Sequence, residues 1–351
     1  YKDSKLNDKK MIFNHVILGL TNHSSRLYFD YLTTFRNLLP KIPPSEISDL
    51  INEMQRLLGT EDPSVGLDFI CSAVNIIAEV HAQYPSSDLP EEACVSAIHK
   101  ILDFPQYEHN QLVLSHSMAP ILTGMPEPQR QAIIRSVYTS ISESEDFTAA
   151  GAHLLSSVAT FSLPAMQKDI GNFLIGKLEH KNRRIREAAL DAISIFKNNP
   201  HIIPDIDIDG LVIHLDNETN DSLFEMAGSL LDDLLRHRKP IERTELMNKY
   251  LGLLSKEGGN KTKALKMLRT LTPSASPEQV SLLVKPMIGC LTDASDIVVK
   301  EALMIVSTII PDIDTEDEKS TTLYSIYTIV DNKPHYSVQV EAVHALEVLY
   351  P

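Results

Sequence analysis

The densest run of candidate ligands in the sequence is an acidic loop at residues 205–216. Asp205, Asp207 and Asp209 alternate with isoleucines, Gly210 follows, and Asp216 lies six residues beyond the glycine. Alternating oxygen ligands, a glycine and a closing carboxylate are typical of EF-hand calcium loops. Here the closing residue is Asp instead of the longer Glu, and two prolines precede the loop where that motif has a helix. The loop is therefore only a weak candidate for a calcium site.

The same acidic turn occurs twice in the chain. Ile202–Asp207 is repeated letter for letter as Ile309–Asp314, without the glycine. Acidic side chains at the start of a helix accept hydrogen bonds from backbone N–H groups and interact favourably with the helix dipole. We therefore interpret both copies as acidic helix caps and expect no resident metal ion.

Other chemistry-bearing motifs are missing from the sequence. Residues 255–262 contain glycines and lysines but no Gly-Lys-Ser/Thr, and the 13 histidines form no His-Glu-x-x-His. The three cysteines are widely spaced and form no Cys-x-x-Cys, which argues against disulfides and zinc and favours an intracellular, cytoplasmic or nuclear, location. We expect no catalytic residue and no cofactor; an enzyme with an unrecognised site remains an alternative.

Basic residues make the best candidate contact surface. Three clusters lie about one helix pair apart, and we call their seven main members the basic stripe: Lys181, Arg183, Arg184, Arg238, Lys239, Lys263 and Lys266. If stacked repeats bring them together, they would bind an acidic protein segment. The alternative is that these are solvated turns and that Arg186, next to the first cluster, is a structural arginine.

The charge distribution indicates which partners fit where. The chain carries a net charge of −15, and it has no Trp. By our count, residues 1–176 carry −8, residues 177–269 carry +1 and residues 270–351 carry −8. A long polyanion would be repelled by most of this chain, so a nucleic-acid partner is not expected, whereas basic protein segments would suit the acidic ends.

Helical spacing dominates the chain. Apolar residues recur every three or four positions in segments of 12–20 residues, and prolines end these segments about every 39 residues, from Pro40 to Pro351. Each period holds two helical segments, such as 166–178 followed by 183–197. This pattern predicts an all-α, right-handed α-solenoid of about nine antiparallel helix pairs, spanning residues 1–351 as a single domain. No apolar run reaches the roughly 18 residues that a membrane-spanning helix needs.

Three of the periods resemble one another in detail. Residues 180–200, 293–311 and 331–351 each open with a polar turn and continue into an Ala- and Leu-rich helix. Each carries a short motif near the helix start: Ile185-Arg186 with Ala188 and Ala189, Val299-Lys300 with Ala302, and Val338-Gln339 with Ala342. This resembles the HEAT-repeat family, whose second helix carries Val-Arg and then Ala; the armadillo repeat is the near alternative.

The resemblance implies a scaffold or adaptor subunit that binds other proteins. A nuclear-transport-receptor-like or tubulin-binding solenoid is the alternative within the same fold, and the acidic ends suit the former. The last segment ends on Val348-Leu349-Tyr350 without a polar cap, so we expect a piece of a longer solenoid.

Local signals also predict helix starts and buried faces. Ser276, Pro277 and Gln279 form a capping-box pattern, although Thr272-Pro273 and Ser276-Pro277 could also be proline-directed phosphorylation sites. The helical spacing predicts six buried side chains: Ala189, Ile193, Phe196, Ala302, Val306 and Ile309.

Overall fold

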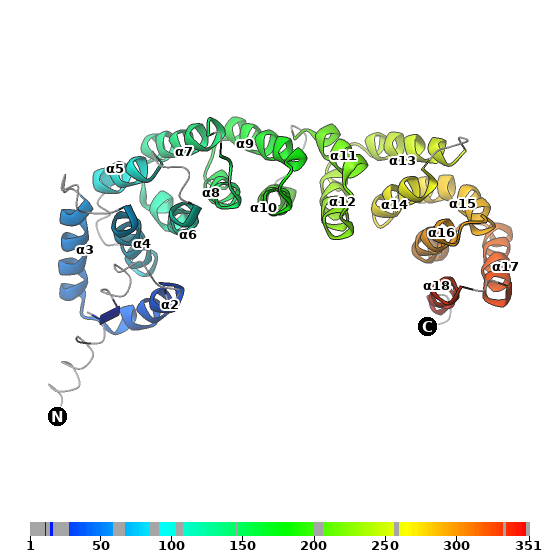
Figure 1. Cartoon of the computed structure of the whole chain (residues 1–351), viewed down its shortest axis with the longest axis horizontal. Helices are drawn as coiled ribbons and strands as arrows, with labels where there is room; N and C mark the ends of the chain where they lie inside the picture. Colours follow the sequence, from blue (N-terminus) through cyan, green and yellow to red (C-terminus); the bar gives the residue numbers. More distant parts are fainter. Residues whose placement is uncertain are drawn as a thin grey trace, which may run out of the picture. The chain divides into compact units, whose positions relative to one another are not determined.

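The computed structural model describes residues 11, 15–16, 28–58, 67–84, 91–102, 108–144, 146–198, 206–255, 260–332 and 335–348. These residues are all-α, with no strand among them (Figure 1). The packing divides the chain into two compact units, residues 1–196 and 197–351. A single solenoid from 1 to 351, its right-handedness and the number of nine helix pairs stay predictions.

Unit 1 contains nine described helices, and their bounds are α2 Tyr28–Leu38, α3 Pro44–Leu58, α4 Leu67–Gln83, α5 Glu91–Leu102, α6 Glu108–Gly124, α7 Glu127–Ser142, α8 Ala149–Ala159, α9 Pro164–Gly176 and α10 Arg183–Ser194. Each odd-numbered helix from α3 to α9 packs against the helix that follows it. The second helices α4, α6, α8 and α10 also pack side by side in that order (Figure 1). This is the arrangement of stacked helix pairs that the sequence period predicted.

Unit 2 repeats the scheme with eight described helices: α11 Ile208–Asn217, α12 Asp221–Arg236, α13 Pro240–Leu254, α14 Lys261–Leu271, α15 Pro277–Leu291, α16 Asp296–Ile309, α17 Glu316–Asn332 and α18 Tyr336–Glu347. The first helices α13, α15 and α17 form one row, and the second helices α12, α14, α16 and α18 form the other. The side chains between the two rows make the core.

The sequence determines these helix starts by local chemistry. Proline occupies the first turn of α9 and α13, where its missing N–H has no intrahelical partner to lose. Asn182, Asn220 and Asn260 cap α10, α12 and α14, each accepting a hydrogen bond from a first-turn backbone N–H. Two prolines differ from the expected pattern, because Pro120 and Pro286 lie inside α6 and α15. Each costs a helix hydrogen bond, which the packing of a long apolar helix outweighs.

The predicted core faces are confirmed. All six residues are at most 2% exposed: Ala189, Ile193, Phe196, Ala302, Val306 and Ile309.

The second helices approach closely where glycine or small polar residues meet. A Cβ atom on Gly228 of α12 would lie 2.4 Å from Cγ2 of Thr270 on α14. In unit 1, Ser117 of α6 donates to Asn75 Oδ1 of α4 over 3.1 Å, which satisfies two polar side chains inside the stack.

Candidate protein-binding surface

The first cluster of the basic stripe lies at the start of α10 in unit 1. Lys181, Arg183 and Arg184 are exposed, and their side chains have no ion-pair partner among the described residues. Arg186 turns back instead, and its Nη1 donates to the carbonyls of His180 and Lys181 over 3.0 and 3.3 Å. Positive charge near a helix N-terminus is opposed by the helix dipole, so these cations are not there to stabilise α10.

The second cluster lies at the turn between α12 and α13, and only part of it is available. Arg238 is bound to Glu242 over 3.1 Å and donates to the carbonyl of Ile206. Lys239 is exposed and precedes α13 directly. Arg243, which follows Lys239 by four residues, is 3% exposed and lies inside the helix stack.

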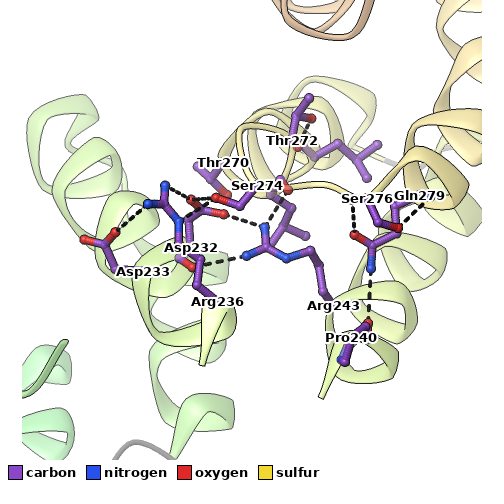
Figure 2. A network of polar contacts seen from close by, with 12 residues as sticks. Asp232, Asp233, Arg236, Pro240, Arg243, Thr270, Thr272, Ser274, Ser276 and Gln279 are labelled. Carbon is purple, nitrogen blue, oxygen red and sulfur yellow. Dashed lines mark hydrogen bonds and ion pairs between the residues drawn. The ribbon is translucent and has the colours of Figure 1, made fainter. Parts of the chain in front are cut away.

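Figure 2 shows where Arg243 goes. It pairs with Asp232 of α12, which is 4% exposed, and also donates to the carbonyl of Leu271 over 2.7 Å. Arg236 and Ser274 donate to the other Asp232 oxygen, Oδ2, over 2.9 and 2.8 Å. The pair therefore ties α12, α13 and the turn after α14 together, and its hydrogen bonds compensate for the burial of both charges.

The third cluster lies on α14, among the second helices of unit 2. Lys266 binds Asp221 of α12 over 2.7 Å, and Arg269 binds Glu225 of α12 and lies 3.4 Å from Glu301 of α16. The Lys266 ammonium holds the pKa of the Asp221 carboxyl below its ordinary value. Lys300 and Glu341 extend these contacts from α16 to α18 over 3.7 Å.

Lys263 differs from the other cations of α14. It lies at the helix start beside Lys266, in a groove of about 310 Å³ that Phe224 and Asp221 of α12 also line. No ion-pair partner of its ammonium group is found in the described part of unit 2. The groove thus combines one unpaired cation, one paired cation and two acidic residues, Glu218 and Asp221.

The basic stripe is consequently split by the structure. Lys181, Arg183 and Arg184 lie in unit 1, and the remaining four cations lie in unit 2. Lys263 and Lys266 share one groove, and Arg238 and Lys239 share one turn, whereas Arg238 and Lys266 are already paired. A continuous stripe stays a prediction, with its available cations being Lys181, Arg183, Arg184, Lys239 and Lys263.

The acidic loop is the start of a helix. Asp207 caps α11 and accepts from the Gly210 N–H over 3.1 Å, and Asp209 is exposed in the first turn. Asp216, at the far end of α11, accepts from the Tyr250 hydroxyl over 3.0 Å. Burial raises the pKa of Tyr250, and the neighbouring Asp216 carboxylate raises it as well. Asp205 lies outside the described residues. No three His, Cys, Asp or Glu side chains in the described ranges are arranged to hold a metal ion.

The second copy of that acidic turn corrects our interpretation of it. Thr315, not Asp314, caps α17, because its Oγ1 accepts from the Glu318 N–H over 3.4 Å and donates to the Glu318 carboxylate over 2.9 Å. Thr competes well as a cap because it can both accept and donate in this way. Ser276 and Gln279 likewise form a complete capping box on α15.

Further observations limit the chemistry of the surface. Cys71, Cys94 and Cys290 are buried, and none of the three forms a disulfide. Among the described residues, no helix combines the length and the apolar character required to cross a membrane.

Comparison with known proteins establishes the fold. No family model matches the sequence, and no curated protein matches it. Solved structures do match: Kap121p bound to Pho4p with a TM-score of 0.67, to Ste12p with 0.65 and to Nup53p with 0.64, each at 12% identity. Each match covers 97% of this chain but only 37–41% of the Kap121p chain. The chain therefore has the fold of the HEAT-like α-solenoids, built from stacked pairs of helices.

Proposed function

We propose that the chain is a non-catalytic, intracellular scaffold or adaptor subunit that binds other proteins along its second helices. The observation that carries this proposal is the pair of second-helix rows, α4 to α10 and α12 to α18, whose stacking leaves charged side chains on the surface. Repeated stacking of this kind creates extended binding surfaces. The fold likeness to Kap121p, which is solved with three different bound proteins, supports it.

Partner contact at the basic stripe is part of the proposal. Arg183 and Arg184 are the sharpest test, because both are exposed and unpaired among the described residues. They would attract an acidic protein segment from a distance and so act mainly on the association rate. Burial and packing of α10 do not depend on them, since its core face is built from other residues.

The experiment begins with partners captured on the immobilised chain and identified by mass spectrometry. Association of each purified partner is then measured with the wild-type chain and with the double variant Arg183→Ala/Arg184→Ala. We expect slower association, with a larger effect at about 50 mM than at about 500 mM salt. The matched control is Arg135→Ala/Lys168→Ala, which removes two exposed cations from the first helices α7 and α9. Equal rates for both double variants at low salt would show that the first cluster is a solvated turn.

A second candidate function is a nuclear-transport-receptor-like role. It is favoured by the net charge of −15, which suits basic cargo, together with the fold likeness to Kap121p. Capture of partners whose binding requires a basic segment, and is lost when that segment is neutralised, would support this candidate over a general adaptor. Capture of acidic partners only would contradict it.

A further inference from the structure

A groove between two first helices of unit 2 has a different character from the charged second-helix surface. It has a volume of about 270 Å³ and lies between the end of α15 and the second half of α17. Leu291 and Ile329 line it and are only 2% and 4% exposed. Tyr324 also lines it and is 75% exposed, so a large aromatic side chain stands in solvent beside a buried apolar surface. Such a site suits one apolar side chain of a partner.

Two acidic residues of α17 lie on nearly the same helix face as Tyr324. Asp317, Tyr324 and Asp331 follow one another at intervals of seven residues, which places them on nearly the same face of the helix. Both aspartates are exposed, and each is about 10.5 Å along the helix axis from Tyr324, at 1.5 Å per residue. An extended chain covers about 10 Å in three residues.

The two helices that form the groove carry a net negative charge. Across α15 and α17 there are five acidic residues, Glu278, Glu316, Asp317, Glu318 and Asp331, against two basic residues, Lys285 and Lys319. Lys333, which follows α17, lies outside the described residues. The comparable groove of unit 1, between α5 and α7, is instead lined by His99, Arg135 and hydroxyl side chains. The apolar groove of unit 2 thus lies between two helices that together carry more acidic than basic residues, whereas the described groove of unit 1 contains an arginine.

We propose that the α15–α17 groove binds an extended segment of a partner protein that carries one apolar anchor residue with a Lys or Arg three residues to either side. The anchor side chain enters the groove against Ile329 and Tyr324, and the two flanking cations face Asp317 and Asp331. This inference rests on the proposed function, since it names a partner class for one face of the scaffold. It places that contact on the first helices α15 and α17, which contain none of the seven cations of the basic stripe.

The test uses the full chain and a labelled probe peptide with a central leucine, serine spacers and a lysine three positions to either side. Binding is measured by fluorescence anisotropy at about 50 mM salt. We expect Tyr324→Ala to weaken binding about tenfold or more, as does replacement of the peptide leucine by serine. The matched control is Tyr327→Ala, because Tyr327 is also exposed on α17 but does not line the groove. Its effect should stay within about twofold.

Charge-reversal variants distinguish recognition of the flanking lysines from binding of the apolar anchor alone. Asp317→Lys/Asp331→Lys should weaken binding of the lysine probe severalfold at low salt and much less at about 500 mM, and a glutamate probe should bind this variant better than the wild type. Glu245→Lys/Glu347→Lys is the control with the same change in net charge, made at exposed positions outside α15 and α17.

Three results would overturn the inference. The first is equal weakening by Tyr324→Ala and Tyr327→Ala, and the second is a probe that does not bind the wild-type chain at millimolar concentration. The third is concentration-dependent self-association that Tyr324→Ala abolishes, since this would assign the groove to a second copy of the chain. If captured partners bind the wild-type chain and Tyr324→Ala equally well, while the probe does not bind the wild-type chain, the groove assignment is wrong and the proposed function stands.

Discussion

At the residue scale, unit 2 contains an ion pair that solvent does not reach. Both members of the Asp232–Arg243 pair are buried (Figure 2). Asp232 accepts further hydrogen bonds from Arg236 and Ser274, and Arg243 donates one to the Leu271 carbonyl. A buried ion pair contributes little net stability, but removing one partner leaves the other charge uncompensated. The pair therefore specifies how α12, α13 and α14 meet more than it strengthens their packing.

Replacing Asp232 should reveal the free-energy cost of an uncompensated buried charge. Asp232→Ala leaves the Arg243 guanidinium buried without its carboxylate, and we expect the free energy of unfolding to fall by about 3–5 kcal/mol in urea denaturation. Asp221→Ala, which removes the 84% exposed partner of Lys266, should change it by no more than about 1 kcal/mol. Similar losses for the two variants would contradict the distinction between buried and exposed pairs.

Glu301 is the residue whose ionisation opposes folding. Burial raises the pKa of its carboxyl, although Arg269 and Lys266 act in the opposite direction, and its Oε2 has no hydrogen-bond partner. A raised folded-state pKa means that the protonated form is favoured by folding, so this contribution is present below the unfolded pKa and is lost as the pH rises through the folded value.

The change in the free energy of unfolding caused by Glu301→Gln should therefore be more favourable at neutral pH than near pH 4. The measurement is the urea midpoint of wild type and variant at about pH 4 and about pH 7, since the neutral amide removes the titration. If the variant is less stable than the wild type at neutral pH but not near pH 4, the attraction of the ionised Glu301 carboxylate to Arg269 outweighs the cost of its burial.

At the element scale, neighbouring second helices are held at a distance that particular small residues allow. Gly228 lets α12 approach Thr270 of α14, because any Cβ atom there would overlap the threonine side chain. Threonine is short and branched, so it cannot move aside as a long side chain could. Glycine in a helix otherwise costs about 0.5–1 kcal/mol relative to alanine.

Two glycine substitutions should consequently have opposite signs. Gly228→Ala should lower the free energy of unfolding by about 1–3 kcal/mol, because overpacking outweighs the gain in helix propensity. Gly252→Ala in α13, where no heavy atom lies within 4 Å of an added Cβ, should raise it by about 0.5–1 kcal/mol. Chemical denaturation of both variants checks the pair, and stabilisation by both would mean that α12 and α14 are not so closely packed.

At the scale of the whole molecule, the two compact units should behave as separate folding units. Each has its own rows of packed first and second helices, and repeat arrays are stabilised by contacts between neighbours. Residues 1–198 and 206–351, expressed separately, should each retain helical circular dichroism and unfold cooperatively. A fragment that is unfolded on its own would show that its stability comes from the rest of the chain.

The helical repeat and its helix starts were predictable from the sequence because they depend on local signals. Apolar spacing identified the faces of α10 and α16, and proline, asparagine and serine marked helix starts. The candidate surface was predictable only in part. Arg183 and Arg184 are exposed, as a contact surface requires, whereas Arg238 and Lys266 of the basic stripe already have ion-pair partners.

The groove beside Tyr324 had no signal in the sequence. Its wall comes from α17 and part of its lining from Leu291 of α15, and no local motif shows that these residues meet. A tyrosine within a helical pattern fits a core position as well as an exposed one, and only the packing of neighbouring first helices distinguishes the two.

The sequence by itself determined that this chain is a helical repeat, where its helices begin and which faces are apolar, because helix periodicity and capping act within a few residues. Only the tertiary structure decided which charges remain available. Lys266 and Arg269 find Asp221 and Glu225 at separations of 45 and 44 residues, about one repeat away. Pairing over that distance depends on how neighbouring repeats stack, and stacking is set by the shape of the packed core instead of by the order of charges along the chain.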